Sequence, residues 1–371
     1  MSSLNQASIK ESIESINFPP SSTEVSPPAL GDAKQIRSVT VEGDSVAVEL
    51  RFGFPVARLK TNITEQVTQA IAAHWPSAKV SVNVEQKIVS HAVQNSVEAI
   101  PGVKNVIAVA SGKGGVGKST TAVNLALALA YEGAKVGILD ADIYGPSQHT
   151  MLGAEDRKPE LVDGSEKMIE PIISHGLQSI SLGYLVDRDS AMIWRGPMAT
   201  QALQQISRDT QWHDLDYLFV DMPPGTGDIH LTLAQQIPVS GAVIVTTPQD
   251  IALQDASKGF NMFKKVDISV LGLIENMATH TCSNCGHEEH IFGSGGGARM
   301  AQEYGMPLLG SLPLDISIRE QADAGKPTVV EDPESVLSQQ YRQIALQLVA
   351  RLAKRKKNMT FKFGNIAVVD K

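Results

Sequence analysis

A glycine-rich segment carries the residue types that bind phosphate. It fits the pattern G-x-x-x-x-G-K-[ST] from Gly112 to Ser119. Glycines let backbone N–H groups turn toward a phosphate chain, and the helix expected to begin at Ser119 adds partial positive charge. Lys118 would reach the terminal phosphates, and the Ser119 hydroxyl would hold Mg²⁺. The predicted nucleotide-binding residues are Gly112, Lys113, Gly114, Gly115, Val116, Gly117, Lys118, Ser119 and Thr120.

The same glycines fit a second pattern. G-x-G-x-x-G, the fingerprint of dinucleotide-binding folds, is met by Gly112, Gly114 and Gly117. Asp140 and Asp142 follow Gly117 at 23 and 25 residues, close to the spacing of the ribose-binding acid. A dehydrogenase has no use for Lys118-Ser119 at the helix start, and it leaves Asp221 without a role. The mononucleotide interpretation is therefore preferred.

Carboxylates follow two short apolar segments. Asp140 and Asp142 come after Val136–Leu139, and Asp221 comes after Tyr217–Val220. Carboxylates at strand ends that face a phosphate loop hold Mg²⁺ or orient an attacking water. We expect Asp221 to contribute to the Mg²⁺ site together with the serine of the phosphate loop.

An asparagine follows another apolar segment. Val270–Ile274 runs into Glu275-Asn276-Met277-Ala278, which lacks the acid of the guanine-reading sequence Asn-Lys-x-Asp. An asparagine amide can pair with N6 and N7 of adenine. Asn276 is therefore a candidate adenine contact, and the pattern favours ATP over GTP.

The chain has two cysteines, Cys282 and Cys285. With two residues between them, both sulfurs can point at one metal centre. Three interpretations stay open: a redox dithiol, a zinc site completed within the chain by His287 and His290, and an iron–sulfur cluster. A cubane cluster takes four thiolates, and two copies of this chain would supply them at a two-fold axis. The third interpretation predicts a homodimer.

These residues need a scaffold that brings several strand ends together. Short apolar strands are expected at Val106–Ala110, Val136–Leu139, Tyr217–Val220, Ala242–Thr246, Val270–Ile274 and Leu308–Leu312. Helices are expected at Ser119–Glu132, Leu231–Gln236, Leu253–Phe263, Ala298–Tyr304 and Ser335–Lys354. Such alternation predicts an α/β fold with a doubly wound, mostly parallel sheet, whose ligands bind at the carboxyl ends of the strands. The glycine run Phe292–Gly297 is expected to be a mobile connector.

The N-terminal quarter of the chain divides into two parts. Residues 1–30 are rich in Ser and Pro and are expected to form a flexible segment, in which Ile9, Ile13 and Ile16 are spaced for a helical turn or two. Residues 31–95 predict a small α+β domain of ββαβ order, followed by the phosphate-loop domain at 100–371. The expected elements of the small domain are Ile36–Val41, Val46–Phe52, Leu59–Trp75 and Ala78–Val84.

Composition excludes several classes of protein. The chain has 371 residues, of which 42% are hydrophobic, and a formal net charge of −8, which argues against a global nucleic-acid clamp. Two cysteines are too few for a small secreted domain that several disulfide bonds stabilise. The sequence shows neither a signal-peptide core nor a run of the ~18 apolar residues needed to cross a bilayer. We expect a cytoplasmic protein without stable membrane insertion and without a nucleic-acid partner.

The segment from Lys113 to Thr120 resembles the deviant phosphate loop of the MinD/ParA/nitrogenase-iron-protein class. In that class an extra lysine early in the loop crosses a dimer interface to the partner's nucleotide. The resemblance assigns this role to Lys113, assigns positioning of the attacking water to Asp142, and places Asp140 closer to the metal.

A wider set of motifs resembles the Mrp/ApbC family of iron–sulfur cluster carrier ATPases over roughly residues 100–350. The set consists of the phosphate loop, Asp140–Ser147, Trp194–Met198, Asp221–Asp228 and the Cys-x-x-Cys motif. The resemblance implies a homodimeric ATPase that holds a cluster, [4Fe-4S] by the thiolate count, at Cys282 and Cys285. It also implies partners among cluster scaffold proteins and apo iron–sulfur proteins.

Two points qualify the resemblance. The small domain resembles an iron–sulfur-assembly domain, but its segment Phe54–Arg58 has no cysteine where relatives can carry one. The basic run Lys354–Lys357 after an amphipathic helix also fits a positioning ATPase that binds membrane or DNA. A structural zinc site at the cysteines is the other alternative.

Overall fold

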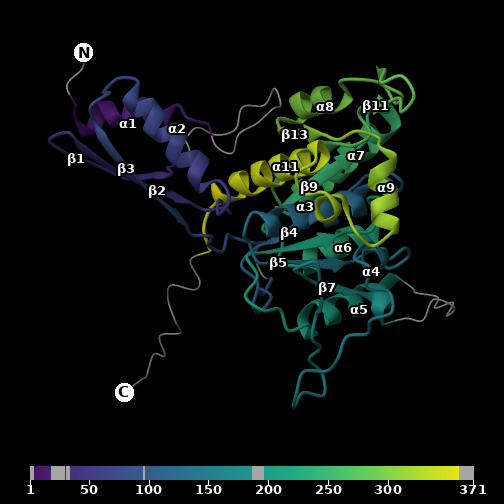
Figure 1. Ribbon diagram of the computed structural model, residues 1–371. Coiled ribbons are helices and arrows are strands. Elements are labelled where there is room, and N and C mark those ends of the chain that lie inside the picture. The colour runs from purple at the N-terminus through teal and green to yellow at the C-terminus, as the bar shows by residue number, and fades with distance from the viewer. Residues whose placement is uncertain (1–3, 18–29, 31–33, 95–96, 186–195, 359–371) are drawn as a thin grey trace, which may run out of the picture.

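The computed structural model describes residues 4–17, 30, 34–94, 97–185 and 196–358. A small three-stranded sheet with its helices lies beside a large eight-stranded sheet, and α11 reaches from the large unit toward the small one (Figure 1). The predicted α/β fold with a preceding small α+β unit is confirmed.

The strands are β1 (Ile36–Glu42), β2 (Ser45–Phe52), β3 (Lys79–Gln86), β4 (Val106–Ala110), β5 (Val136–Asp140), β6 (Ile172–Ser174), β7 (Leu177–Ser181), β8 (Tyr217–Asp221), β9 (Gly241–Thr246), β10 (Val270–Glu275), β11 (His280–Thr281), β12 (Glu288–Glu289) and β13 (Leu308–Ser311). The helices are α1 (Gln6–Glu14), α2 (Lys60–Ala72), α3 (Lys118–Tyr131), α4 (Gln148–Met151), α5 (Gly196–Asp209), α6 (Asp228–Gln236), α7 (Asp250–Lys265), α8 (Gly296–Tyr304), α9 (Ile316–Asp323), α10 (Thr328–Glu331) and α11 (Val336–Ala353), with a 3₁₀ turn at Leu182–Tyr184.

The large sheet has the order β13-β10-β9-β4-β8-β5-β7-β6. Its strand pairs are parallel apart from the β6–β7 hairpin. Because β8 lies between β4 and β5, Asp140 at the end of β5 stands in register with Asp221 at the end of β8. The topology therefore brings the two predicted acids beside the loop that follows β4.

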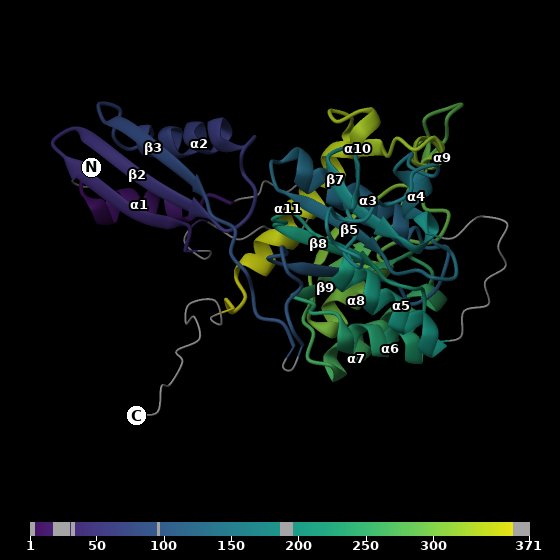
Figure 2. The ribbon, with the colours of Figure 1, turned by 90° about the horizontal axis from the view of Figure 1, so that it is seen from below.

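Alternating residues of the central strand point into two different cores. Ile107 and Val109 of β4 belong to one hydrophobic cluster, and Val106 and Ala108 belong to the other. This two-sided burial explains why the strands read as continuous apolar runs. Helices α3 and α11 cover one face of the sheet, and α5, α6, α7 and α8 lie on the other (Figure 2).

The small domain has the predicted ββαβ order, with β1 antiparallel and β3 parallel to β2. The segment 1–30, which is expected to be flexible, contains helix α1. A capping box between Asn5 and Ser8 begins this helix. Ile9 and Ile13 are fully buried, and α1 contacts β1 and α2. Isoleucines at this spacing form one apolar stripe, which the neighbouring sheet covers.

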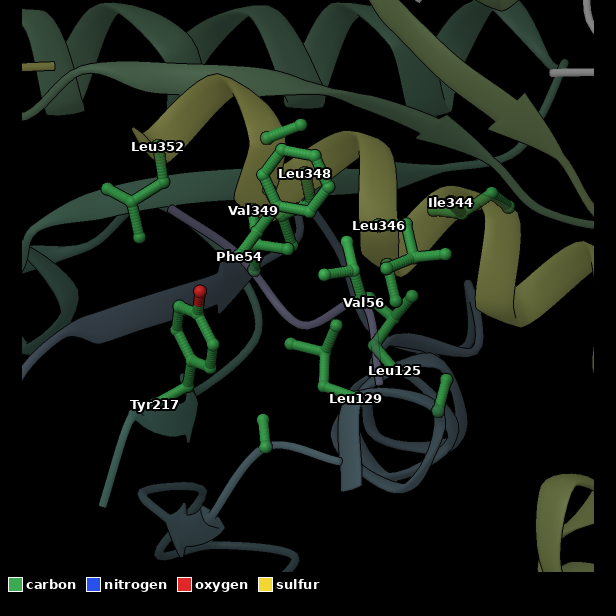
Figure 3. Packing of buried hydrophobic residues seen from close by; sticks show 14 of the residues in the cluster. Phe54, Val56, Leu125, Leu129, Tyr217, Ile344, Leu346, Leu348, Val349 and Leu352 are labelled. Carbon is green, nitrogen blue, oxygen red and sulfur yellow. The ribbon is translucent and has the colours of Figure 1, made fainter. Parts of the chain in front are cut away.

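The two units share a hydrophobic core. Phe54 and Val56, which follow β2, are 1% and 0% exposed and belong to the same cluster as Leu129 of α3 and Leu348 and Leu352 of α11. Figure 3 shows Phe54 and Val56 lying among the side chains of α11 and α3. The segment Phe54–Arg58, which has no cysteine, thus packs onto the large domain through Phe54 and Val56.

Helix α11 packs along most of its length. Its buried residues include Tyr341, Ile344 and Leu348, which lie in the core on the α3 face of the sheet. In the described part of the chain, no helix is long and apolar enough to cross a membrane.

Candidate functional site

The glycine-rich loop connects β4 to α3, as predicted. Gly115 and Gly117 both have φ of +80°, a conformation that side-chain-bearing residues rarely adopt, and Gly117 is the N-cap of α3. A Cβ on Gly112 would come within 2.1 Å of the Asp255 backbone. The glycines therefore let the chain turn tightly and approach α7, which leaves the N-terminus of α3 open to a phosphate chain.

Asn276 holds this loop from the other side. Its Nδ2 donates a 2.9 Å hydrogen bond to the carbonyl of Val116, and the amide lies where a Cβ on Gly117 would be. The side chain is 7% exposed. The structure thus gives Asn276 a loop-positioning contact that the sequence did not indicate. Its contact with adenine stays a prediction.

Lys118 and the predicted Mg²⁺ acid form a buried ion pair. The Lys118 Nζ donates to Asp221 Oδ1, and lies 3.2 Å from the Ser119 hydroxyl and 4.0 Å from Asp142 Oδ2. Lys118 is 5% exposed and Asp221 is fully buried. Four of the predicted residues therefore meet at one point. A buried charge pair of this kind needs each partner, since either charge alone would be left desolvated.

Gln148 at the start of α4 completes the cluster, and sequence reasoning missed it. Its Nε2 donates to Asp221 Oδ2 over 2.8 Å and to the carbonyl of Ser119 over 3.1 Å. The side chain is fully buried. It therefore links the β8 acid to the phosphate loop, and no motif in the sequence marks a glutamine for that purpose.

Asp140 positions the loop that leads to Gln148. Its Oδ2 accepts hydrogen bonds from the backbone N–H groups of Ser147 and Gln148 at 2.9 and 3.0 Å and from the Ser181 hydroxyl at 3.0 Å. Its Oδ1 accepts from the N–H of Asp142 at 3.1 Å. Burial, and then the charge of Asp221, raise its pKa to about 7. These contacts favour a positioning role for Asp140 over direct metal contact.

Asp142 and Lys113 are the remaining predicted residues of the loop region. Burial raises the pKa of Asp142, which Lys118 opposes. Lys113 is partly exposed, its carbonyl accepts from the Ser111 hydroxyl, and it forms no ion pair with any described residue. Their roles with water and with a partner's nucleotide stay predictions. The side chain of Asp228 lies outside what the structure describes.

His230 in α6 is a second buried group near the site that the sequence did not single out. It is 2% exposed. Burial lowers its pKa to about 4, and the charge of Lys118 also acts in that direction. A neutral imidazole therefore stands behind the 223–227 loop, where it adds no further positive charge.

The two cysteines lie at the tip of a short hairpin. Strands β11 and β12 pair on either side of them, and the N–H of Cys282 donates to the carbonyl of His287 at 2.9 Å. Cys282 is partly exposed and Cys285 is exposed. The N–H groups of Cys285 and Asn284 lower the pKa of Cys282, which favours its thiolate. The hairpin therefore presents two thiols to the surface.

One chain does not assemble a full metal site around these thiols. Within the described residues, no group of three or more His, Cys, Asp or Glu side chains is arranged to hold a metal ion. The His290 Nδ1 lies 2.8 Å from the carbonyl of Ala278. The histidines proposed for a one-chain zinc site do not join the cysteines in this arrangement.

The glycine run after the hairpin differs from the prediction of a mobile connector at its C-terminal end. Gly296 and Gly297 are buried at the start of α8, and the Gly297 N–H donates to Glu275 Oε1 at 2.6 Å. A Cβ on Gly296 would lie 2.6 Å from the carbonyl oxygen of Pro248. Glycine here permits close packing that a mobile connector would not need.

A family model described as "ParA: NUBPL iron-transfer P-loop NTPase" matches residues 102–349. The chain belongs to this family. It is 54% identical over 319 residues to an iron-sulfur cluster carrier protein of Escherichia coli, covering 86% of each chain. It is 50% identical over 255 residues to the iron-sulfur cluster transfer protein NUBPL of Mus musculus, covering 68% of this chain and 79% of that one.

Among solved structures, the fold is similar to a nucleotide-binding protein of Archaeoglobus fulgidus in complex with ADP. The TM-score is 0.54 at 35% identity, covering 63% of this chain and 90% of that chain. Membership of the family confirms the predicted resemblance and the predicted P-loop ATPase class, and excludes the dehydrogenase interpretation. Trp194 and Arg195 of the predicted motif set lie outside the described residues.

Proposed function

We propose that the protein is an ATP-dependent carrier that binds an iron–sulfur cluster at Cys282 and Cys285 and transfers it to apo-proteins. The observation that carries this proposal is the exposed cysteine hairpin on a phosphate-loop ATPase domain. The names of its relatives, a cluster carrier and a cluster transfer protein, support the same cargo.

The nucleotide half of the mechanism rests on Lys118. In the structure this lysine pairs with Asp221, so the cation is already held at the end of the phosphate loop. When ATP arrives, we expect Lys118 to turn to the terminal phosphates and release the Asp221 carboxylate. The freed carboxylate and the Ser119 hydroxyl are oxygen ligands of the kind that Mg²⁺ prefers, and Mg²⁺ there would neutralise phosphate charge.

The water and dimer roles belong to two further residues. We propose that Asp142, whose Oδ2 lies 4.0 Å from Lys118 Nζ, orients the attacking water. Lys113 has no ion-pair partner among the described residues, so its charge is available to a nucleotide across a dimer interface.

The proposal for cluster binding rests on the number of cysteine ligands. Each chain supplies two cysteine ligands, and a [4Fe-4S] cluster takes four. Two chains related by a two-fold axis would complete the site, with the lowered pKa of Cys282 favouring the ligating thiolate. A cluster between two ATPase domains would be released when the dimer rearranges, and cluster donors and acceptors are its expected partners.

The test is anaerobic quantification of iron and sulfide per dimer after reconstitution. The full chain should bind one cluster per two chains, and Cys282→Ala should bind none while its ADP affinity is unchanged. The matched control is Ser283→Ala, which alters the same loop without removing a thiol. A full cluster on Cys282→Ala, or one zinc per monomer in place of iron, would overturn the proposal.

A further inference from the structure

A cavity of about 780 Å³ lies where the small domain meets the end of α11. Figure 2 shows this junction, with α11 reaching the strands of the small domain. Lysines and arginines from both units line the cavity, and none of the described residues that line it is an Asp or Glu. They are Lys34, Arg37, Arg51, Lys87, Lys104, Lys354, Arg355 and Lys357. Eight cations thus surround one hollow in a chain whose net charge is −8.

Only part of this charge is neutralised by the protein. Arg51 pairs with Glu85, and Lys104 pairs with Asp216 at 2.8 Å. For the other lysines and Arg37 around the cavity, the described residues provide no ion-pair partner, and Arg355 donates to the carbonyl of Ser240. Several like charges held around one concave space repel one another, so the arrangement favours an anion between them.

Two buried polar side chains, Gln35 and His91, line the cavity beside these cations. Gln35, 3% exposed, lines the cavity, and no described residue provides a hydrogen-bond partner for its Oε1. Because this amide oxygen is an acceptor, a bound water that donates one hydrogen to it and the other to an anion would satisfy it. His91 also lines the cavity, and its pKa is lowered by burial and by the charges of Lys357 and Arg355, against hydrogen bonds with Asn105 and the Ala353 carbonyl.

We propose that this cavity binds a small polyanion carrying two or more phosphate or carboxylate groups. Its volume lies within the range of ~300–1,000 Å³ that small-ligand sites occupy, which favours a small molecule over a nucleic acid or a protein surface. The cations come from both sides: Lys34, Arg37, Arg51 and Lys87 from the small domain, and the remainder from the large one. A bound polyanion therefore bridges the two domains and stabilises their docked arrangement.

The site is separate from the phosphate loop, so binding can be measured with that loop filled. The full chain is saturated with Mg²⁺–ADP and titrated by calorimetry with pyrophosphate and, in a second arm, with benzene-1,3,5-tricarboxylate. We expect saturable binding of one anion per chain, and the tighter arm identifies phosphate or carboxylate as the preferred group. Bound anion should also raise the unfolding temperature.

The variant Arg37→Gln with Lys357→Gln removes one cation from each domain. Because each of these cations can donate a charge-assisted hydrogen bond to the anion, anion affinity should fall about tenfold or more. The matched control, Lys264→Gln with Lys265→Gln, removes the same charge from the exposed end of α7 and should bind as the wild type does. ADP affinity, unchanged in both variants, shows that the nucleotide site and the fold are intact.

Three outcomes would overturn the proposal. One is the absence of saturable binding by the wild type in both arms. Another is equal affinity in the cavity variant and the control. The third is binding of a single-stranded oligonucleotide at this cavity that neither small anion displaces, which would make the hollow part of a nucleic-acid surface. Each result is independent of cluster binding at the cysteines.

Discussion

The Gln148 Nε2 lies 2.8 Å from Asp221 Oδ2 and 3.1 Å from the carbonyl oxygen of Ser119. One buried amide therefore fixes the carboxylate at the end of β8 relative to the first turn of α3. Replacement by alanine leaves a buried carboxylate oxygen without this donor, a loss of about 1.5–3 kcal/mol. Gln148→Ala should lower ATP hydrolysis about 10- to 100-fold, measured as phosphate release at saturating ATP.

The control for this prediction is Gln205→Ala, on the exposed side of α5. It should hydrolyse ATP at the wild-type rate. Wild-type activity in Gln148→Ala would show that Asp221 does not depend on this amide for its position.

Asn276 provides a test that separates two roles. Its amide donates to the Val116 carbonyl and lies against Gly117, so Asn276→Asp would place a carboxylate oxygen against a carbonyl oxygen. Asn276→Asp should weaken ADP and GDP binding together, and more than Asn276→Ala does, because the loop itself is disturbed. If the amide also contacts adenine, Asn276→Ala should reduce the preference for ADP over GDP. Competition titrations with both nucleotides measure this ratio.

Asp140 should make stability depend on pH. Its pKa is raised to about 7, above the value of ~3.9 for an aspartate in an unfolded chain. Between about pH 4 and 7 the folded protein keeps a proton that the unfolded chain releases, so this residue's contribution to stability falls as pH rises through that range. Asp140→Asn cannot ionise. Its unfolding temperature relative to wild type should therefore increase from pH 5 to pH 8.

The matched variant Asp163→Asn removes an exposed carboxylate, and its difference from wild type should change little over the same range. A constant difference between Asp140→Asn and wild type at the two pH values would mean that Asp140 is already ionised at pH 5. Nucleotide-free protein is used, because a bound nucleotide changes the surroundings of Lys118 and Asp221.

The large sheet could be predicted because the composition of each strand reflects its burial. Continuous apolar runs such as Val106–Ala110 are typical of strands buried on both faces, and all six predicted strands are present. The β6–β7 hairpin was not predicted, because Leu177–Ser181 is polar at three of its five positions and the hairpin lies at the edge of the sheet. The isoleucine spacing indicated only a helical turn or two where α1 forms, because the burial of this helix depends on its contacts with β1 and α2.

Part of the candidate site could also be predicted from local sequence. Glycines, Lys118 and Asp221 follow patterns that a phosphate ligand imposes, and they converge in the structure. Gln148 and the Asn276–Val116 contact depend on which strand ends become neighbours, information that local sequence does not contain. The cavity cations are spread from Lys34 to Lys357 and become one cluster only when the two domains dock.

The last prediction concerns the packing of the small domain against the large one. Phe54 is 1% exposed and shares a hydrophobic cluster with α3 and α11. Phe54→Ala should cost about 3–5 kcal/mol, because it leaves a cavity in a core that belongs to both domains. Hydrogen exchange followed by mass spectrometry should then show faster exchange in α11 as well as in the small domain. Ile316→Ala, at a side chain 67% exposed, is the control and should leave exchange unchanged. Faster exchange confined to the small domain would mean that α11 does not depend on this contact.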